Sequence, residues 1–179
     1  MLLERFPKLW SEEDTQRLTK AVLNCPELRD ENGIVEYYRN SHGITNLPET
    51  LDYVDKMTAI LKQVYHKPIR FSNTYSRIYR KGSFLGIHTD RQGLDITMSV
   101  CIRKTAVQKW PLCVSLNPWE GPWNREVDPE PWKDLYYAIN LNEGDAAVME
   151  GIIYPHWRDE LVCDDDQHAL YVFYHWTKE

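Results

Sequence analysis

Two short segments of the chain contain residue types that bind metal ions. His88 and Asp90 form a His-x-Asp pair, and His156 lies far downstream, directly after Pro155. Residues i and i+2 of a strand point to the same side, so an imidazole and a carboxylate could reach one ion together. Two histidines and one carboxylate on one face of a metal suit non-haem Fe(II), because they leave adjacent positions open. Zn²⁺ accepts the same ligand types, so these residues alone do not select the metal.

The residues that must position this pair alternate as strands do. Tyr75, Arg77 and Tyr79 share one face, and a turn that contains glycine separates them from His88. From residue 69 onward, apolar residues recur at every second position, which is the period of a strand. Further strands are predicted at residues 94–103, 112–116, 146–149 and 168–176.

The N-terminal part of the chain has a helical period instead. A helix is predicted from Ser11, whose side chain can cap it, to about Asn24. A second helix with one apolar face is expected to start after Pro48 and to run to about Tyr65. Helices followed by a series of short strands predict a mainly β fold, an antiparallel sandwich or jelly roll supported by N-terminal helices.

The composition is that of an ordinary globular protein. The chain has 179 residues, of which 42% are hydrophobic and 27% are charged. This length suits a single domain over residues 1–179, with a mostly helical buttress at 1–66 and a β core at 67–179. A net charge of −6 and the lack of a basic stripe argue against a nucleic-acid partner.

The sequence also gives expectations about location. No apolar run approaches the length of a membrane-spanning helix, and the first residues are too few and too charged for a signal peptide. The four cysteines are widely spaced, which fits reduced thiols rather than disulfides or a zinc ribbon. We therefore expect a cytoplasmic protein without a membrane partner.

Taken in order, these segments resemble a known enzyme family. The stretch from Tyr79 to Asp90, the turn Gly144-Asp145 and the distal His156 are similar to the 2-oxoglutarate- and Fe(II)-dependent oxygenases. Within them the chain looks most like the prolyl 4-hydroxylase-type branch, and the resemblance covers residues 75–176. It implies a double-stranded β-helix, which is a kind of jelly roll.

The resemblance also implies a reaction and a set of site residues. His88, Asp90 and His156 would hold Fe(II), and Tyr79 matches the family tyrosine that hydrogen-bonds to 2-oxoglutarate. With O2, the implied dioxygenase hydroxylates a C–H bond of a peptide side chain or a small molecule and releases succinate and CO2. The protein supplies positioning and exclusion of water.

One family feature is missing at its usual place. Many members carry an arginine or lysine about ten residues past the distal histidine, where it pairs with the far carboxylate of 2-oxoglutarate; this chain has Asp166 there. A planar guanidinium suits that bidentate task. Arg158, His168 and Arg77 are the candidate replacements, and the sequence does not choose among them.

A long segment rich in proline and tryptophan, residues 117–136, shows no periodicity. It is either a lid or substrate platform, or a surface excursion packed by Trp119, Trp123 and Trp132. Trp110 and Trp157 are further candidates for the cavity wall. His42, His66 and His175 are expected to be structural or exposed.

Two other classes of function stay open at this point. One is a metal enzyme of another reaction class on a similar barrel, such as a cupin-like isomerase or a zinc hydrolase. The other is a non-catalytic binding module that has kept the barrel, which the missing anchor at Asp166 would fit. An intact set of three metal ligands argues against the binding module. The substrate and the oligomeric state are not predicted.

Overall fold

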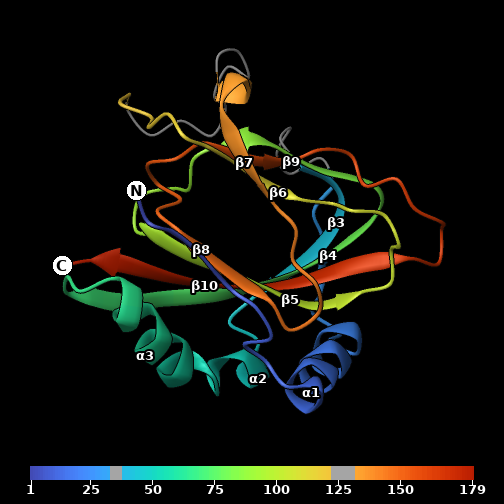
Figure 1. Ribbon diagram of the computed structural model, residues 1–179. Helices are drawn as coiled ribbons and strands as arrows, with labels where there is room; N and C mark the ends of the chain where they lie inside the picture. The colour runs from blue at the N-terminus through green and yellow to red at the C-terminus, as the bar shows by residue number, and fades with distance from the viewer. Residues whose placement is uncertain (33–37, 122–131) are drawn as a thin grey trace.

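A curled antiparallel sheet dominates the computed structural model, which describes residues 1–32, 38–121 and 132–179 (Figure 1). Its strands follow the order β1-β8-β5-β10-β4-β9-β6-β7, with β3 paired to β4 and β2 paired to β3. The fold is mainly β and is a jelly-roll double-stranded β-helix, as the sequence predicts. The strands are β1 (Leu3–Phe6), β2 (Arg29–Asp30), β3 (Tyr38–Thr45), β4 (Ile69–His88), β5 (Ile96–Lys104), β6 (Leu112–Ser115), β7 (Tyr136–Ile139), β8 (Ala146–Met149), β9 (His156–Arg158) and β10 (His168–Lys178).

Helices cover one face of this sheet. Figure 1 shows α1, α2 and α3 below β5 and β10, with β6, β7 and β9 on the far side. Ser11 caps α1 by accepting a hydrogen bond from the backbone N–H of Asp14, as expected. The described helices are α1 (Glu12–Leu23), α2 (Pro48–Leu51), α3 (Val54–Val64) and the short 3₁₀ helix η1 (Trp132–Asp134).

Strand alternation separates a core face from a cavity face. On β5, Met98 and Val100 pack in the core beneath the sheet, with Leu18 of α1 and Met57 of α3. The intervening side chains, such as Thr97, line a cavity inside the curl. The helices therefore fix the sheet from below and leave its upper face to the site.

The structure differs from the sequence analysis in the N-terminal 66 residues, where a mostly helical buttress is expected. This part also supplies β1, β2 and β3, and β3 pairs along β4. The expected helix at 48–65 is two helices, because the chain turns at Asp52 and Tyr53 between α2 and α3. These strands are short or polar, and long-range pairing rather than local pattern makes them strands.

Gly82 marks a second difference. A turn is expected between Tyr79 and His88, but β4 continues through this region as one strand. Gly82 has a φ of +74°, a conformation that favours glycine, and its N–H donates to the carbonyl of Leu161 at 2.9 Å. The predicted turn is thus a local irregularity within β4, which lets this strand cross from one side of the curl to the other.

Candidate metal centre

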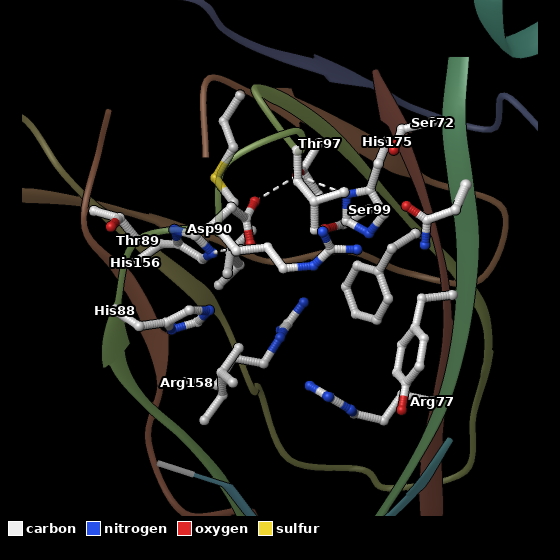
Figure 2. Close-up of a pocket in the computed structure, with 18 of the residues that line it drawn as sticks. Ser72, Arg77, His88, Thr89, Asp90, Thr97, Ser99, His156, Arg158 and His175 are labelled. Atoms are coloured by element: carbon white, nitrogen blue, oxygen red, sulfur yellow. Dashed lines mark hydrogen bonds and ion pairs between the residues drawn. The ribbon is translucent and has the colours of Figure 1, made fainter. Parts of the chain in front are cut away.

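His88, Asp90 and His156 come together at one end of the cavity, as the sequence predicts for these three residues. His88 ends β4 and His156 begins β9, and the two residues are paired in register across these neighbouring strands. One ligand atom from each of the three side chains lies within 4.8 Å of the others. Figure 2 shows the three side chains on the same wall of the cavity.

Hydrogen bonds to the backbone orient both imidazole rings. Nδ1 of His88 lies 2.8 Å from the carbonyl oxygen of Gly86, and Nδ1 of His156 lies 3.0 Å from that of Tyr154. A carbonyl only accepts, so each Nδ1 carries a proton, and Nε2 is the ring nitrogen that each neutral imidazole would offer to a metal. Burial, and then the neighbouring His156, lower the pKa of His88 to about 3, which keeps it neutral. Neutral imidazole is the form that binds a metal.

The Asp90 carboxylate is held from two sides. Its Oδ2 accepts a hydrogen bond from the Thr97 hydroxyl at 2.5 Å, while its Oδ1 lies 3.8 Å from Nε2 of His156. Burial raises the pKa of Asp90, but nearby His156 and His175 outweigh it, so the pKa is lowered and the group is ionised. Gly151 makes room for it, because a Cβ there would lie 1.9 Å from Oδ2.

The three side chains open into a cavity of about 530 Å³, within the usual range for a small-molecule site. Strands β4, β5, β9 and β10 all contribute to its wall. Its lining includes Arg77, Arg158, Phe173 and His175. The cavity therefore joins the candidate metal ligands to two of the three candidate anchors.

Arg158 is a buried cation at this wall. It lies two residues after His156 on the same face of β9 and is 1% exposed. Its Nη1 donates to the carbonyl of Trp110 at 3.0 Å, and its guanidinium lies over the rings of Tyr171 and Trp110. Its Nε and Nη2 have no partner among the residues that the structure describes. A buried charge without a counter-ion is costly, so an anion is expected at this position.

Arg77 lines the same cavity but already has an acidic partner. Its Nε and Nη2 donate to the buried Glu31 carboxylate at 2.8 and 3.0 Å. Its Nη1 donates to the hydroxyl of Tyr79 at 3.3 Å. Tyr79 itself is fully buried and packs against Trp110 and Tyr171. Arg77 thus lines the cavity, whereas Tyr79 supports Arg77 and is not among the residues that line the cavity.

The third candidate anchor, His168, does not reach the cavity. It pairs with Arg80 at the start of β10, and alternation places it on the face of Leu170, away from Tyr171. Ala169 occupies the inward position next to it. Of the three candidates, only Arg158 combines a place on the cavity wall with nitrogens that lack a partner in the described part of the chain.

The tryptophans expected near the site lie elsewhere. Trp110 packs behind Arg158, and Trp157 points to the opposite face of β9 beside Ile87. Trp119 contacts Trp132, with ring centroids 5.6 Å apart. Trp123 and the rest of residues 122–131 lie outside the described residues, so the lid hypothesis stays a prediction.

Three residues near the metal ligands were not singled out from the sequence as site residues. They are Thr97, Gly151 and His175, of which His175 was expected to be structural or exposed. His175 is 6% exposed and lines the cavity. A signal was present for it, since it shares the inward face of β10 with Tyr171 and Phe173. The sequence contains no such signal for Thr97 or Gly151, because only folding brings these two residues to Asp90.

Comparison with known proteins was made by sequence and by structure. No family model and no curated protein matches the sequence. Solved structures do match, and the matches span nearly the whole chain. The carbocyclase SnoK of nogalamycin biosynthesis aligns with 99% of this chain and 81% of its own, at 16% identity and a TM-score of 0.74. The viral collagen prolyl hydroxylase of Paramecium Bursaria Chlorella virus-1 aligns with 98% of this chain and 96% of its own, at 14% identity and a TM-score of 0.65.

The fold is that of the 2-oxoglutarate- and Fe(II)-dependent oxygenases. HygX from Streptomyces hygroscopicus, solved with nickel, 2-oxoglutarate and hygromycin B, also has this fold; it aligns with 97% of this chain and 81% of its own, at 12% identity and a TM-score of 0.70. The resemblance stated from the sequence is therefore confirmed at the level of the fold. A carbocyclase and a prolyl hydroxylase share this oxygenase fold, so the fold does not select a substrate.

No described helix is both long enough and apolar enough to cross a membrane.

Proposed function

We propose that this protein is a non-haem Fe(II)- and 2-oxoglutarate-dependent dioxygenase that hydroxylates a C–H bond of a peptide side chain or a small molecule. The observation that carries the proposal is Arg158, a buried guanidinium with two unpartnered nitrogens in the described part of the chain. It lines the same cavity as His88, Asp90 and His156. A site with three metal ligands and one unpaired cation fits a metal-chelating dicarboxylate.

In this proposal His88, Asp90 and His156 hold the metal. The two neutral imidazoles present Nε2, and the carboxylate adds one negative charge that partly neutralises the ion. When bound, Fe(II) supplies the activation of O2, coupled to oxidation of 2-oxoglutarate to succinate and CO2. Three protein ligands on one side leave the remaining positions to the cosubstrate and O2.

Arg158 is the proposed anchor for the far carboxylate of 2-oxoglutarate. Arg158 follows His156 by two residues on the same face of β9, so one strand would present both a metal ligand and the anchor to the cosubstrate. The rings of Tyr171 and Trp110 both pack against the guanidinium and would help to exclude water from the resulting ion pair. Arg77 stays with Glu31, and Tyr79 braces Arg77 from behind.

The wider part of the cavity is left to the substrate. Thr45, Asn73 and Arg91 lie on its lining together with the apolar Leu94 and Phe173. This mixed lining suits either a peptide side chain or a small polar molecule. One domain over the whole chain and a cytoplasmic location stay predictions from the composition.

The test is formation of succinate from 2-oxoglutarate by the Fe(II)-loaded protein in air. We expect slow succinate formation by the wild type even without a known substrate, and none by Asp90→Ala. Succinate formation by Asp90→Ala at the wild-type rate would exclude the three-ligand assignment. Metal binding without succinate would point to another metal chemistry, and no metal binding would point to a binding module.

A further inference from the structure

Three strands bring His175, Thr97 and Asp90 into one hydrogen-bonded chain. Thr97 Oγ1 lies 2.5 Å from Asp90 Oδ2 and 3.0 Å from His175 Nδ1 (Figure 2). Asp90 follows β4, Thr97 is on β5 and His175 is on β10, where it pairs with Thr97 in register. All three side chains line the cavity. The contact is therefore part of the site wall and not of the core beneath the sheet.

The directions of these hydrogen bonds follow from the chemistry of the groups. An ionised carboxylate only accepts, so the single proton of the Thr97 hydroxyl goes to Asp90. The Thr97 oxygen must then accept from His175, which places the imidazole proton on Nδ1. Nε2 of the neutral His175 ring then carries the lone pair.

This chain of hydrogen bonds fixes the orientation of the Asp90 carboxylate. With Oδ2 tied to Thr97, Oδ1 is the oxygen that lies toward Nε2 of His156. Without the N–H of His175, the Thr97 hydroxyl would lose the group that fixes its rotation. Outer hydrogen bonds of this kind hold metal-binding carboxylates in place, and their loss commonly weakens metal affinity about 10- to 100-fold.

We propose that His175 is a positioning residue that acts through Thr97 to hold the Asp90 carboxylate with a single oxygen turned toward the metal. The same tautomer leaves Nε2 of His175 as a hydrogen-bond acceptor. The inference rests on the proposed function only in that Asp90 binds the metal. It adds a residue on β10 that the three-ligand pattern does not contain.

The first test is a titration of metal-free protein with Co²⁺, followed by its visible absorption. Thr97→Val should weaken binding about tenfold, and His175→Phe should weaken it in the same direction by a smaller factor. His175→Asn should restore most of the affinity, because its amide can place an N–H near the position of Nδ1. Ser99→Ala, one inward position further along β5, is the matched control and should bind as the wild type does.

Thermal unfolding of each metal-free variant separates lost metal affinity from lost folding. If His175→Phe does not fold, the ring-nitrogen signals of His175 in the wild type and in Thr97→Val, measured in the second test, still decide the inference. Equal Co²⁺ affinity for the wild type, Thr97→Val and His175→Phe would overturn it and leave the proposed function intact. Failure of the wild type to bind Co²⁺ would instead overturn both.

The second test needs no metal. Nitrogen-15 NMR of the imidazole rings in the metal-free protein reports which ring nitrogen of His175 carries the proton. We expect the proton on Nδ1, and we expect Thr97→Val to change that signal while Ser99→Ala does not. A proton on Nε2 of His175 would contradict the proposed chain of hydrogen bonds.

Discussion

Gly151 shows how closely the site depends on single atoms. Its carbonyl accepts a hydrogen bond from the N–H of Asp90, and a Cβ at this position would lie 1.9 Å from the Asp90 carboxylate. Gly151→Ala should therefore displace Asp90 and weaken metal binding about tenfold or more, with secondary structure unchanged. Calorimetric titration with Ni²⁺ and circular dichroism check the two halves of this prediction.

A double variant provides the control for Gly151. In the Asp90→Ala background, the added methyl group meets an alanine instead of a carboxylate. Gly151→Ala should then cost much less free energy of unfolding than it does in the wild type. An equal cost in both backgrounds would show that the glycine is required by the backbone and not by Asp90.

At the scale of single residues, the sequence predicts the three metal ligands but not the residues that hold them in place. His88, Asp90 and His156 are recognisable because their residue types and order resemble a family pattern. Arg158 is one of three candidates, and its place on the cavity wall, with two guanidinium nitrogens that lack a partner in the described part of the chain, distinguishes it from Arg77 and His168. Thr97 and Gly151 carry no chemical signal in the sequence, because their roles depend on contacts between distant strands.

Asp145 holds neighbouring elements of the fold together and is not part of the metal site. Its buried carboxylate accepts from Nη2 of Arg5 at 2.7 Å and from the backbone N–H groups of Lys8 and Asn142. It thereby ties β1 to the turn before β8. Asp145→Asn should lower the free energy of unfolding by about 2 kcal/mol, because an amide cannot accept all three bonds. Metal affinity should not change.

Urea denaturation of Asp145→Asn measures that loss. Glu143→Gln is the matched control, because Glu143 pairs with Arg103 at an exposed position and should lose less than about 1 kcal/mol. A stable Asp145→Asn protein that fails to bind metal would contradict the separation of this structural carboxylate from the site.

The helices and strands whose apolar residues recur with a clear period are predicted correctly. The helix expected from Ser11 is α1, and the strands expected at 94–103 and 168–176 are β5 and β10. The strand β3 was missed because its sequence, Tyr38–Thr45, has no apolar alternation. Pairing with β4, and not a local apolar pattern, makes this segment a strand. Contacts between residues that are far apart in sequence cannot be predicted from local patterns.

The stability of the whole metal-free protein should depend on pH through its buried histidines. Burial lowers the pKa of His88 to about 3 and that of His175 to about 4. An unfolded chain protonates its histidines near pH 6.5, so below that pH the unfolded state binds more protons. Stability should be full above pH 6.5 and should fall as the pH drops toward 4. Each histidine contributes up to about 1.4 kcal/mol per pH unit in this range.

Urea denaturation with a chelator present, at several pH values between 7 and 5, measures this slope. His175→Asn removes one titrating group and should reduce the slope by about one proton. Ser99→Ala, which lines the same cavity and removes no titrating group, is the control and should leave the slope as in the wild type. A slope that His175→Asn does not change would contradict the neutral, buried state of this imidazole.

On the scale of the whole molecule, the order of helices and strands predicts an antiparallel sandwich or a jelly roll, and the family resemblance selects the jelly roll that the fold shows. The sequence does not predict the substrate, and the lining of the cavity shows the physical reason. The metal ligands and Arg158 occupy one end, while the remaining lining mixes polar and apolar side chains from several strands. Such a surface is assembled only on folding and has no signature along the chain.

The central claim is that one cavity binds Fe(II) and 2-oxoglutarate together, and an anaerobic titration tests it most directly. Fe(II) and then 2-oxoglutarate are added to metal-free protein, and the visible charge-transfer band of the chelated cosubstrate is followed. We predict a band that saturates in the wild type, is absent in Asp90→Ala, weakens in Arg158→Met and is retained in His168→Ala. Clear Fe(II) binding with no band in the wild type, or an Arg158→Met protein with wild-type affinity for 2-oxoglutarate, would contradict the account.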